Sequence, residues 1–192
     1  MKKIILASAS PRRKELLRRV GIEFSVVPSK SKEVTYRTMP EEAVKELSYQ
    51  KAREVFEKGN RDSIVIGADT IVYLEGNILG KPVDKEEWSR VLHDIQGKRH
   101  HVYTGVTVIW TGEDENMHVL SFAEDTRVYI HEMTDSEIDE YIELGEAADK
   151  AGGYGIQGYF AKYVDRIEGD YNNVVGLPVA KLYQELKKLE LV

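Results

Sequence analysis

The sequence predicts an α/β fold in which helices flank a mixed β-sheet. In the first half of the chain, short apolar β-branched segments alternate with amphipathic segments of helical period. The middle holds two long alternating segments joined by a polar turn, which is typical of antiparallel strands. The 192 residues are 42% hydrophobic and 31% charged, the balance of a globular protein with one domain or two closely packed lobes.

The N-terminal segment predicts a strand followed directly by a helix. Residues 3–7 are apolar and β-branched, as expected of a short buried strand. Ser10 is a suitable helix cap, and Pro11 at the first helical position has its φ angle preset. Leucines at helical spacing follow, and Gly21 is expected to end this helix.

The next elements repeat this alternation of strand and helix. Residues 24–27 predict a second short strand, and residues 40–58 form a long amphipathic pattern typical of a helix. Residues 63–68 are strongly apolar and predict a buried strand. We expect Asp69 and Thr70 to lie at the C-terminal end of that strand.

The rest of the chain supplies a hairpin, longer strands and further helices. Thr134 and Glu137 form a capping box at the start of one of these helices. Residues 151–158 form a glycine-rich loop. The remaining predicted elements are a hairpin of residues 71–74 and 78–79, strands 101–110 and 119–130, and helices 85–95, 134–144 and 177–189.

Composition excludes several classes of function. The chain has no cysteine, which excludes disulfides, zinc–thiolate sites and thiol nucleophiles and suits a reducing compartment, so we expect a cytoplasmic protein. No apolar stretch is long enough for a membrane span, so we expect no membrane partner. The formal net charge of −6 argues against a nucleic-acid partner.

The basic cluster after the first strand suggests an anion site. A helix N-terminus offers backbone N–H groups and the positive end of its dipole to an anion. Ser8 adds a hydroxyl, and Arg12 and Arg13 can each donate two hydrogen bonds to phosphate oxygens. The alternative is a capped surface helix with solvated arginines, and the residues alone leave both interpretations open.

Asp69 is the second candidate, because a carboxylate at the end of a buried strand lies where open α/β sheets place ligands. It could hold Mg²⁺ or act as a general base, or it could simply cap a turn. Lys81 and Lys51 could neutralise phosphate charge, although most lysines are solvated. Glu33 could be a second metal carboxylate or a surface residue.

The glycine-rich loop is the third candidate, because its backbone can approach a ligand closely. Gln157 could pair with a base edge through its amide. Tyr154 could stack on a base, although a buried tyrosine is more common. The five histidines show no spacing typical of a zinc site.

Taken together, these motifs resemble the Maf family of nucleoside triphosphate pyrophosphatases, first associated with inhibition of septum formation. The matching blocks run in the family's order from residue 4 to about residue 180. They are residues 8–13, 51–52, 67–70, 80–82, 101–106, 150–158 and 172–178.

The resemblance implies a single Maf-like domain over residues 1–192, with two lobes, an extended mixed sheet and a nucleotide cleft between the lobes. This fold would be similar to that of inosine triphosphate pyrophosphatases. The implied reaction cleaves between the α- and β-phosphates with a divalent cation, Mg²⁺ or Mn²⁺. Asp69 matches the family's proton acceptor. The positions that handle phosphate and metal are matched by Ser8, Arg12, Arg13, Glu33, Lys51 and Lys81.

Within the family, the chain is most similar to the subgroup that acts on dTTP and UTP. Arg12, Thr70 and the run of residues 155–158 that contains Gln157 carry this resemblance, and Thr70 separates the subgroup from the one acting on 7-methyl-GTP. One departure concerns the loop before Glu33, which carries lysines and serines where acidic residues are usual. This departure leaves Glu33 as the only carboxylate of the segment and argues against a second metal site from this loop. The resemblance implies Glu33 and Asp69 as the metal ligands.

Two other functions stay open on the sequence. A nucleotidyltransferase also releases pyrophosphate, but its opening loop is usually rich in glycine, and residues 8–13 contain none. A nucleotide-sensing regulator of cell division would bind the same substrate. The metal, the physiological nucleotide and a homodimeric state are not decided by the residues.

Overall fold

The computed structural model describes residues 2–30, 32–147 and 150–192, which form two compact units. Unit 1 comprises Met1–Asp69, Thr104–Glu124 and Gly176–Val192, and unit 2 comprises Thr70–Tyr103 and Asp125–Val175. The boundary between the units falls inside three long strands of the chain.

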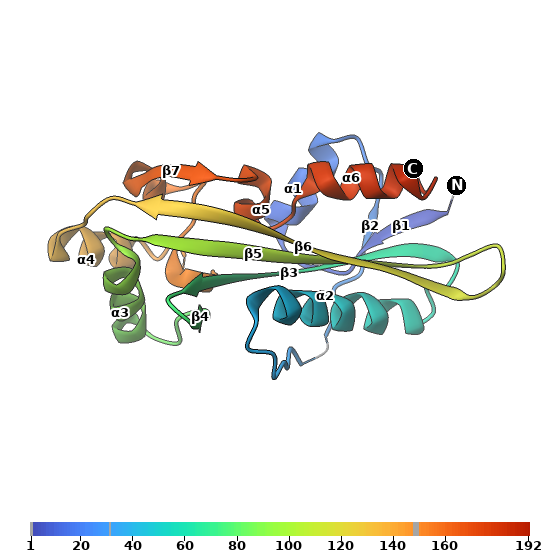
Figure 1. The fold of residues 1–192 in the computed structure, drawn as a ribbon, viewed down its shortest axis with the longest axis horizontal. Helices are drawn as coiled ribbons and strands as arrows, with labels where there is room; N and C mark the ends of the chain where they lie inside the picture. Colours follow the sequence, from blue (N-terminus) through green and yellow to red (C-terminus); the bar gives the residue numbers. More distant parts are fainter. Residues whose placement is uncertain (1, 31, 148–149) are drawn as a thin grey trace. The chain divides into compact units, whose positions relative to one another are not determined.

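Over the described residues, seven strands form one mixed sheet in the order β2-β1-β3-β5-β6-β7, with β4 paired to β3 (Figure 1). β1 pairs in parallel with β2 and β3, whereas β3 pairs with β4 and β6 with β7 in antiparallel fashion. The strands are β1 Lys3–Leu6, β2 Ser25–Val26, β3 Ser63–Leu74, β4 Asn77–Leu79, β5 Arg99–Thr111, β6 Met117–Ile130 and β7 Val164–Glu168. This arrangement confirms the predicted mixed α/β fold.

The predicted helices are present with small shifts at their ends. Ser10 caps the first helix by accepting a hydrogen bond from the Arg13 amide, and Thr134 and Glu137 form the expected capping box. The α-helices are α1 Pro11–Arg19, α2 Pro40–Glu57, α3 Lys85–Ile95, α4 Asp135–Leu144, α5 Tyr171–Val175 and α6 Val179–Lys188, and η1 Ala151–Gly153 and η2 Tyr159–Tyr163 are 3₁₀ turns.

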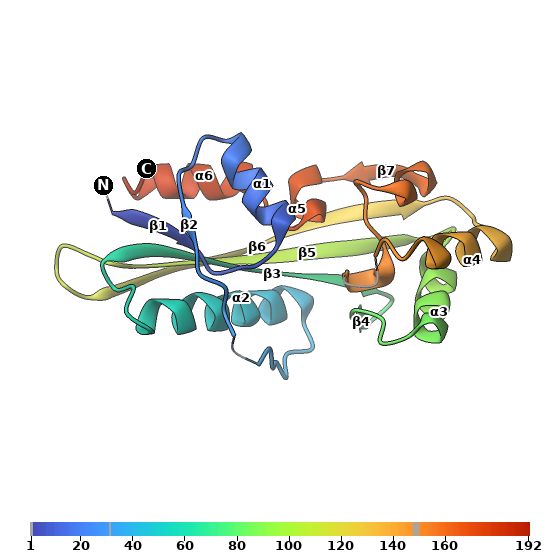
Figure 2. The ribbon, with the colours of Figure 1, turned by 180° about the vertical axis from the view of Figure 1, so that it is seen from behind.

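Two glycines let α2 lie unusually close to the sheet of unit 1. A Cβ atom added at Gly67 of β3 would collide with the Ser48 carbonyl and come within 2.9 Å of the Ala52 Cβ. One added at Gly105 of β5 would collide with the Val44 carbonyl. Glycine in a strand marks such an approach of another backbone. In both views α2 runs beside β3 (Figures 1 and 2).

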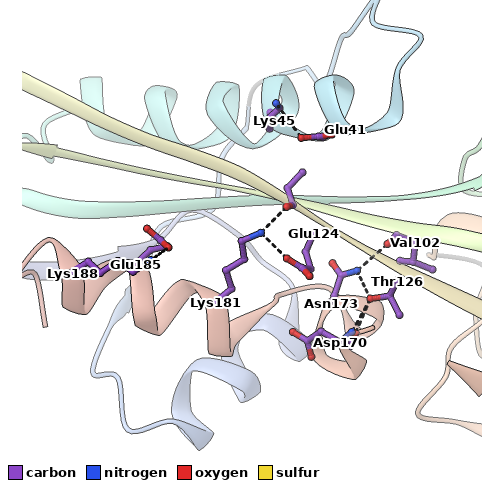
Figure 3. Close-up of polar contacts among 11 residues, drawn as sticks. Glu41, Lys45, Val102, Glu124, Thr126, Asp170, Asn173, Lys181, Glu185 and Lys188 are labelled. Atoms are coloured by element: carbon purple, nitrogen blue, oxygen red, sulfur yellow. Dashed lines mark hydrogen bonds and ion pairs between the residues drawn. The ribbon is translucent and has the colours of Figure 1, made fainter. Parts of the chain in front are cut away.

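On the opposite side of the unit 1 sheet from α2 lie α1 and α6 (Figures 1 and 2). Lys181 of α6 donates hydrogen bonds to the Ala123 carbonyl at 3.0 Å and to Glu124 at 2.7 Å, which ties the helix to β6 (Figure 3). Helices therefore cover both faces of this part of the sheet, as parallel strands require.

Unit 2 has a separate core rich in aromatic rings. Trp88 of α3, Tyr141 of α4 and Phe160 of η2 are buried in it. The Trp88 indole donates to the Gly153 carbonyl at 2.6 Å, and His100 shares a 2.7 Å hydrogen bond with the Tyr154 hydroxyl. The glycine-rich loop is thereby fastened to the core, and Tyr154 is a buried tyrosine, the commoner of the two outcomes expected.

The segment before residue 176 is held by a fully buried asparagine. Asn173 of α5 donates from Nδ2 to the Val102 carbonyl and to the Thr126 hydroxyl, both at 2.9 Å (Figure 3). The Thr126 hydroxyl also accepts a hydrogen bond from the Asp170 amide at 3.1 Å. These bonds give a structural reason for part of the 172–178 block, to which the sequence assigned no role.

The prediction that Asp69 ends a strand is wrong, because β3 continues without interruption from Ser63 to Leu74. Residues 72–74 pair with β4, and this hairpin extends the strand beyond the apolar run. Among the described elements, β7, α5 and both 3₁₀ turns were not predicted from the sequence. Each of these segments spans five residues or fewer, so tertiary contacts rather than periodicity define them.

Among the described residues, no helix combines the length and the apolar character that crossing a membrane would require.

His100 makes the stability of the fold depend on pH. Burial lowers the pKa of His100 to about 4 from its ordinary value of 6.5. Between these values the unfolded chain binds a proton that the folded chain does not, so stability falls as the pH falls. We expect the free energy of unfolding in urea to drop by about 2 kcal/mol from pH 7 to pH 5 through this residue.

The variant His100→Phe isolates this contribution. Its stability should be lower at pH 7, because the Tyr154 hydroxyl loses its partner, but it should depend less on pH over the same interval. His131→Gln is the control, since the side chain of His131 is 59% exposed. An equal pH dependence in the wild type and His100→Phe would contradict this account.

Candidate functional site

Residues 8–13, the basic segment after β1, form a cradle in which Ser8 and Arg13 are joined by a hydrogen bond. Arg13 of α1 donates from Nη1 to the Ser8 hydroxyl at 3.1 Å and from Nε to the Gly176 carbonyl at 2.8 Å. The Ser8 oxygen also accepts a hydrogen bond from the Ser10 amide at 3.3 Å. Ser8 is buried and Arg13 is partly buried, so these are not solvated surface groups.

Asp69, Lys51 and Glu33 form a second polar group in unit 1. The Lys51 Nζ atom lies 2.5 Å from Asp69 Oδ1 and 2.9 Å from Glu33 Oε1. The side chains of Lys51 and Asp69 are only 11% and 9% exposed, whereas that of Glu33 is 51% exposed. One ammonium group therefore links a nearly buried carboxylate to a carboxylate at the surface.

The close approach of α2 explains why these groups meet. Gly67 and Asp69 are two residues apart on β3, so both face the same side of the sheet, which is the side that α2 covers. Lys51 precedes Ala52, the residue that packs against Gly67. The helix thus brings its lysine directly over the Asp69 carboxylate.

The cradle and the carboxylates act on one another electrostatically. Burial lowers the pKa of Arg13, the negative charge of Asp69 opposes this effect, the charge of Arg12 adds to it, and Glu33 opposes it weakly. Arg13 therefore interacts electrostatically with the carboxylates of both Asp69 and Glu33. The structure brings together within unit 1 all the predicted site residues from Ser8 to Asp69, namely Ser8, Arg12, Arg13, Glu33, Lys51 and Asp69.

These residues fit a divalent cation only if other ligands join them. Among residues 2–30, 32–147 and 150–192, no three His, Asp or Glu side chains gather closely enough to hold a metal. Two carboxylates do converge on one cation, the Lys51 ammonium. Mg²⁺ commonly takes one or two carboxylates and completes its shell with water and substrate phosphates. The donor set therefore fits a metal ion shared with a nucleotide.

The other three predicted site residues belong to unit 2. Thr70 is a partly buried residue of β3, Lys81 is exposed in the loop after β4, and Gln157 is exposed in a turn of the glycine-rich loop. The neighbouring Gly80 carbonyl accepts a hydrogen bond from the Gly152 amide at 3.0 Å, so the Lys81 loop and the glycine-rich loop are joined. The roles of these three residues stay predictions.

Sequence reasoning missed the residues that support the site. Gly176 supplies the carbonyl that orients Arg13, at a φ of 121° that favours glycine. Gly67 and Gly105 admit α2. An isolated glycine within a strand pattern is a signal of close backbone approach, and both of these glycines stand in such patterns.

Comparison with known proteins identifies a family and relatives of this chain. The protein family described as "Maf-like protein" matches residues 3–189 of this chain. A "dTTP/UTP pyrophosphatase" of Agathobacter rectalis is 50% identical, covering 98% of both chains. A protein of the same name from Lachnoclostridium phytofermentans is 47% identical, covering 98% of this chain and 95% of the relative.

A solved structure supports the fold. The HAM1 protein from Coxiella burnetii aligns with a TM-score of 0.55 at 16% identity, covering 98% of this chain and 100% of that one. At this identity the likeness concerns the fold alone. With a family match over nearly its whole length and relatives close to half identical, this chain belongs to the Maf-like protein family.

Proposed function

We propose that this chain hydrolyses dTTP and UTP to the nucleoside monophosphate and pyrophosphate. The observation that carries the proposal is the nearly buried Asp69 carboxylate beside Lys51, in the same unit as the Ser8–Arg13 cradle. The names of the relatives from A. rectalis and L. phytofermentans support the choice of substrates.

The cradle is suited to the triphosphate. The N-terminus of α1 presents backbone N–H groups and the positive end of the helix dipole. Ser8 and Gly176 hold the Arg13 guanidinium in one orientation, which reduces the entropy lost when it contacts a phosphate. Arg12 adds a second positive charge on the same helix. We assign phosphate binding in unit 1 to Ser8, Arg12, Arg13 and Lys51.

Asp69 is the proposed general base. A water molecule attacks the α-phosphorus, its proton passes to an Asp69 carboxylate oxygen, and the bond from the α-phosphorus to the bridging oxygen breaks. Pyrophosphate then leaves with the bonding electrons. Lys51, which contacts Asp69 at 2.5 Å, lies where it can neutralise charge that develops on the phosphates. A divalent cation held by Asp69 and Glu33 would supply further neutralisation of that charge.

In unit 2, we assign phosphate binding to Lys81 and base selection to Thr70 and Gln157. These assignments rest on the family resemblance. Gln157 is exposed, and its amide can both donate to and accept from a pyrimidine edge.

A panel of nucleoside triphosphates tests the reaction. With Mg²⁺ or Mn²⁺ present, we expect dTTP and UTP to give monophosphate and pyrophosphate, separated by ion-exchange chromatography. The kcat/KM values should exceed those for purine triphosphates about tenfold or more, because hydrogen bonds to the base discriminate strongly. Release of orthophosphate and nucleoside diphosphate would contradict cleavage at the α-phosphorus.

Asp69→Asn tests the general base. Loss of the base should lower kcat about 10²- to 10⁴-fold, while a non-hydrolysable dTTP analogue should still bind, as followed by calorimetry. Asp62→Asn, at an exposed position just before β3, is the matched control and should retain activity. Turnover close to that of the wild type in Asp69→Asn would remove Asp69 from the mechanism. Loss of turnover with retained binding also yields a variant that separates hydrolysis from nucleotide sensing.

Arg13→Ala tests the cradle. Removing the guanidinium should raise the KM for dTTP about ten- to a hundredfold, because hydrogen bonds to charged groups contribute about 1.5–3 kcal/mol. Arg19→Ala on the same helix is the control, since Arg19 is exposed and pairs with Glu15. Thermal unfolding of both variants shows whether the fold is kept. An unchanged KM in a folded Arg13→Ala protein would exclude a role in binding.

A further inference from the structure

Lys51 stands at the point where two carboxylates from different parts of unit 1 converge. Its ammonium lies 2.5 Å from Asp69 on β3 and 2.9 Å from Glu33 in the segment between β2 and α2. Such a position, between two carboxylate oxygens, is also the position that a divalent cation would take. Lysine and a metal ion would therefore compete for the same oxygens.

In the absence of nucleotide, the charges around the two carboxylates favour the Lys51 ammonium over a divalent ion. The two carboxylates and the ammonium leave one net negative charge in a group whose central members are about nine-tenths buried. A divalent ion added there would reverse the sign of the group. It would also lie close to Arg13, which interacts electrostatically with both carboxylates. Like charges in a partly buried site repel strongly.

Displacing the lysine carries a second cost. Lys51 would lose both carboxylate partners while its side chain remains only 11% exposed, and an unpaired charge at such a position is strongly unfavourable. A triphosphate removes this cost, because its oxygens offer the ammonium new anionic partners. It also supplies the remaining ligands that the two carboxylates cannot provide for the metal.

We propose that Lys51 occupies the cation position between Asp69 and Glu33 in the nucleotide-free protein, so that a divalent metal ion enters only together with the triphosphate. When the nucleotide binds, Lys51 moves from the carboxylates to phosphate oxygens, and the metal takes its place. This inference deepens the proposed function and rests on it for the identity of the nucleotide.

Binding of Mn²⁺ alone tests the inference without turnover. Electron paramagnetic resonance measures free Mn²⁺ in the presence of the wild-type protein, first without nucleotide and then with α,β-imido-dTTP, which the protein cannot cleave between the α- and β-phosphates. We expect Mn²⁺ to bind to the protein together with the analogue about tenfold or more tightly than to the analogue alone. Without the analogue, we expect the protein to bind Mn²⁺ weakly. Strong binding of Mn²⁺ to the nucleotide-free wild type would overturn the proposal.

Lys51→Met and Lys51→Arg separate charge from structure. Lys51→Met removes the ammonium group that contacts both carboxylates and should bind Mn²⁺ without nucleotide about tenfold more tightly than the wild type. Lys51→Arg keeps the charge and should exclude Mn²⁺ as the wild type does. Equal Mn²⁺ affinities of Lys51→Met and the wild type would overturn the proposal. The comparison of the wild type with and without the analogue needs no variant.

Lys45→Met is the matched control, because Lys45 lies on the same helix and its removal changes the net charge equally. Lys45 pairs with Glu41 at 3.5 Å (Figure 3) and with Glu42 at 3.9 Å. Its removal should leave Mn²⁺ binding as in the wild type, and an effect as large as that of Lys51→Met would overturn the proposal in favour of general electrostatics. Product analysis with dTTP tests the proposed function separately, so failure of either is recognised by itself.

Discussion

The close contact between α2 and the sheet of unit 1 is the constraint on which the candidate site depends. Only glycine fits at positions 67 and 105, because the backbone of α2 occupies the space that a side chain would need. A larger residue at either position would collide with the backbone of α2 and force the helix away from the sheet, because a close-packed interior has no space for the added atoms. Lys51 belongs to α2, so its distance from Asp69 depends on how closely the backbones of α2 and β3 pack.

This packing also sets the electrostatics of the site. Asp69 and Lys51 are nearly buried, where opposite charges attract strongly and unpaired charges are costly. Arg13 is held by the Ser8 hydroxyl and the Gly176 carbonyl, so its guanidinium is oriented before any ligand arrives. The protein thus keeps positive and negative groups in place against their tendency to be solvated, which is typical of sites that bind a charged substrate.

Prediction from the sequence succeeded where a signal is local. The capping of α1 by Ser10, the capping box of α4 and the period of α2 are all written in neighbouring residues, and the structure confirms them. Asp69 shows the opposite case. Its apolar run ends at residue 68, yet β3 continues because β4 folds back and pairs with it. Strand ends depend on pairing partners, which a local pattern does not reveal.

The site divides in the same way. The sequence by itself determined the chemical groups, namely a capped helix start with Ser8, Arg12 and Arg13, an aspartate after an apolar run, and the motifs of the Maf-like family. Only the tertiary structure decided that Lys51 bridges Asp69 and Glu33 and that the Gly176 carbonyl orients Arg13. These contacts join residues that lie between 18 and 163 positions apart. Such pairings depend on how backbones pack in space, so no local sequence pattern encodes them.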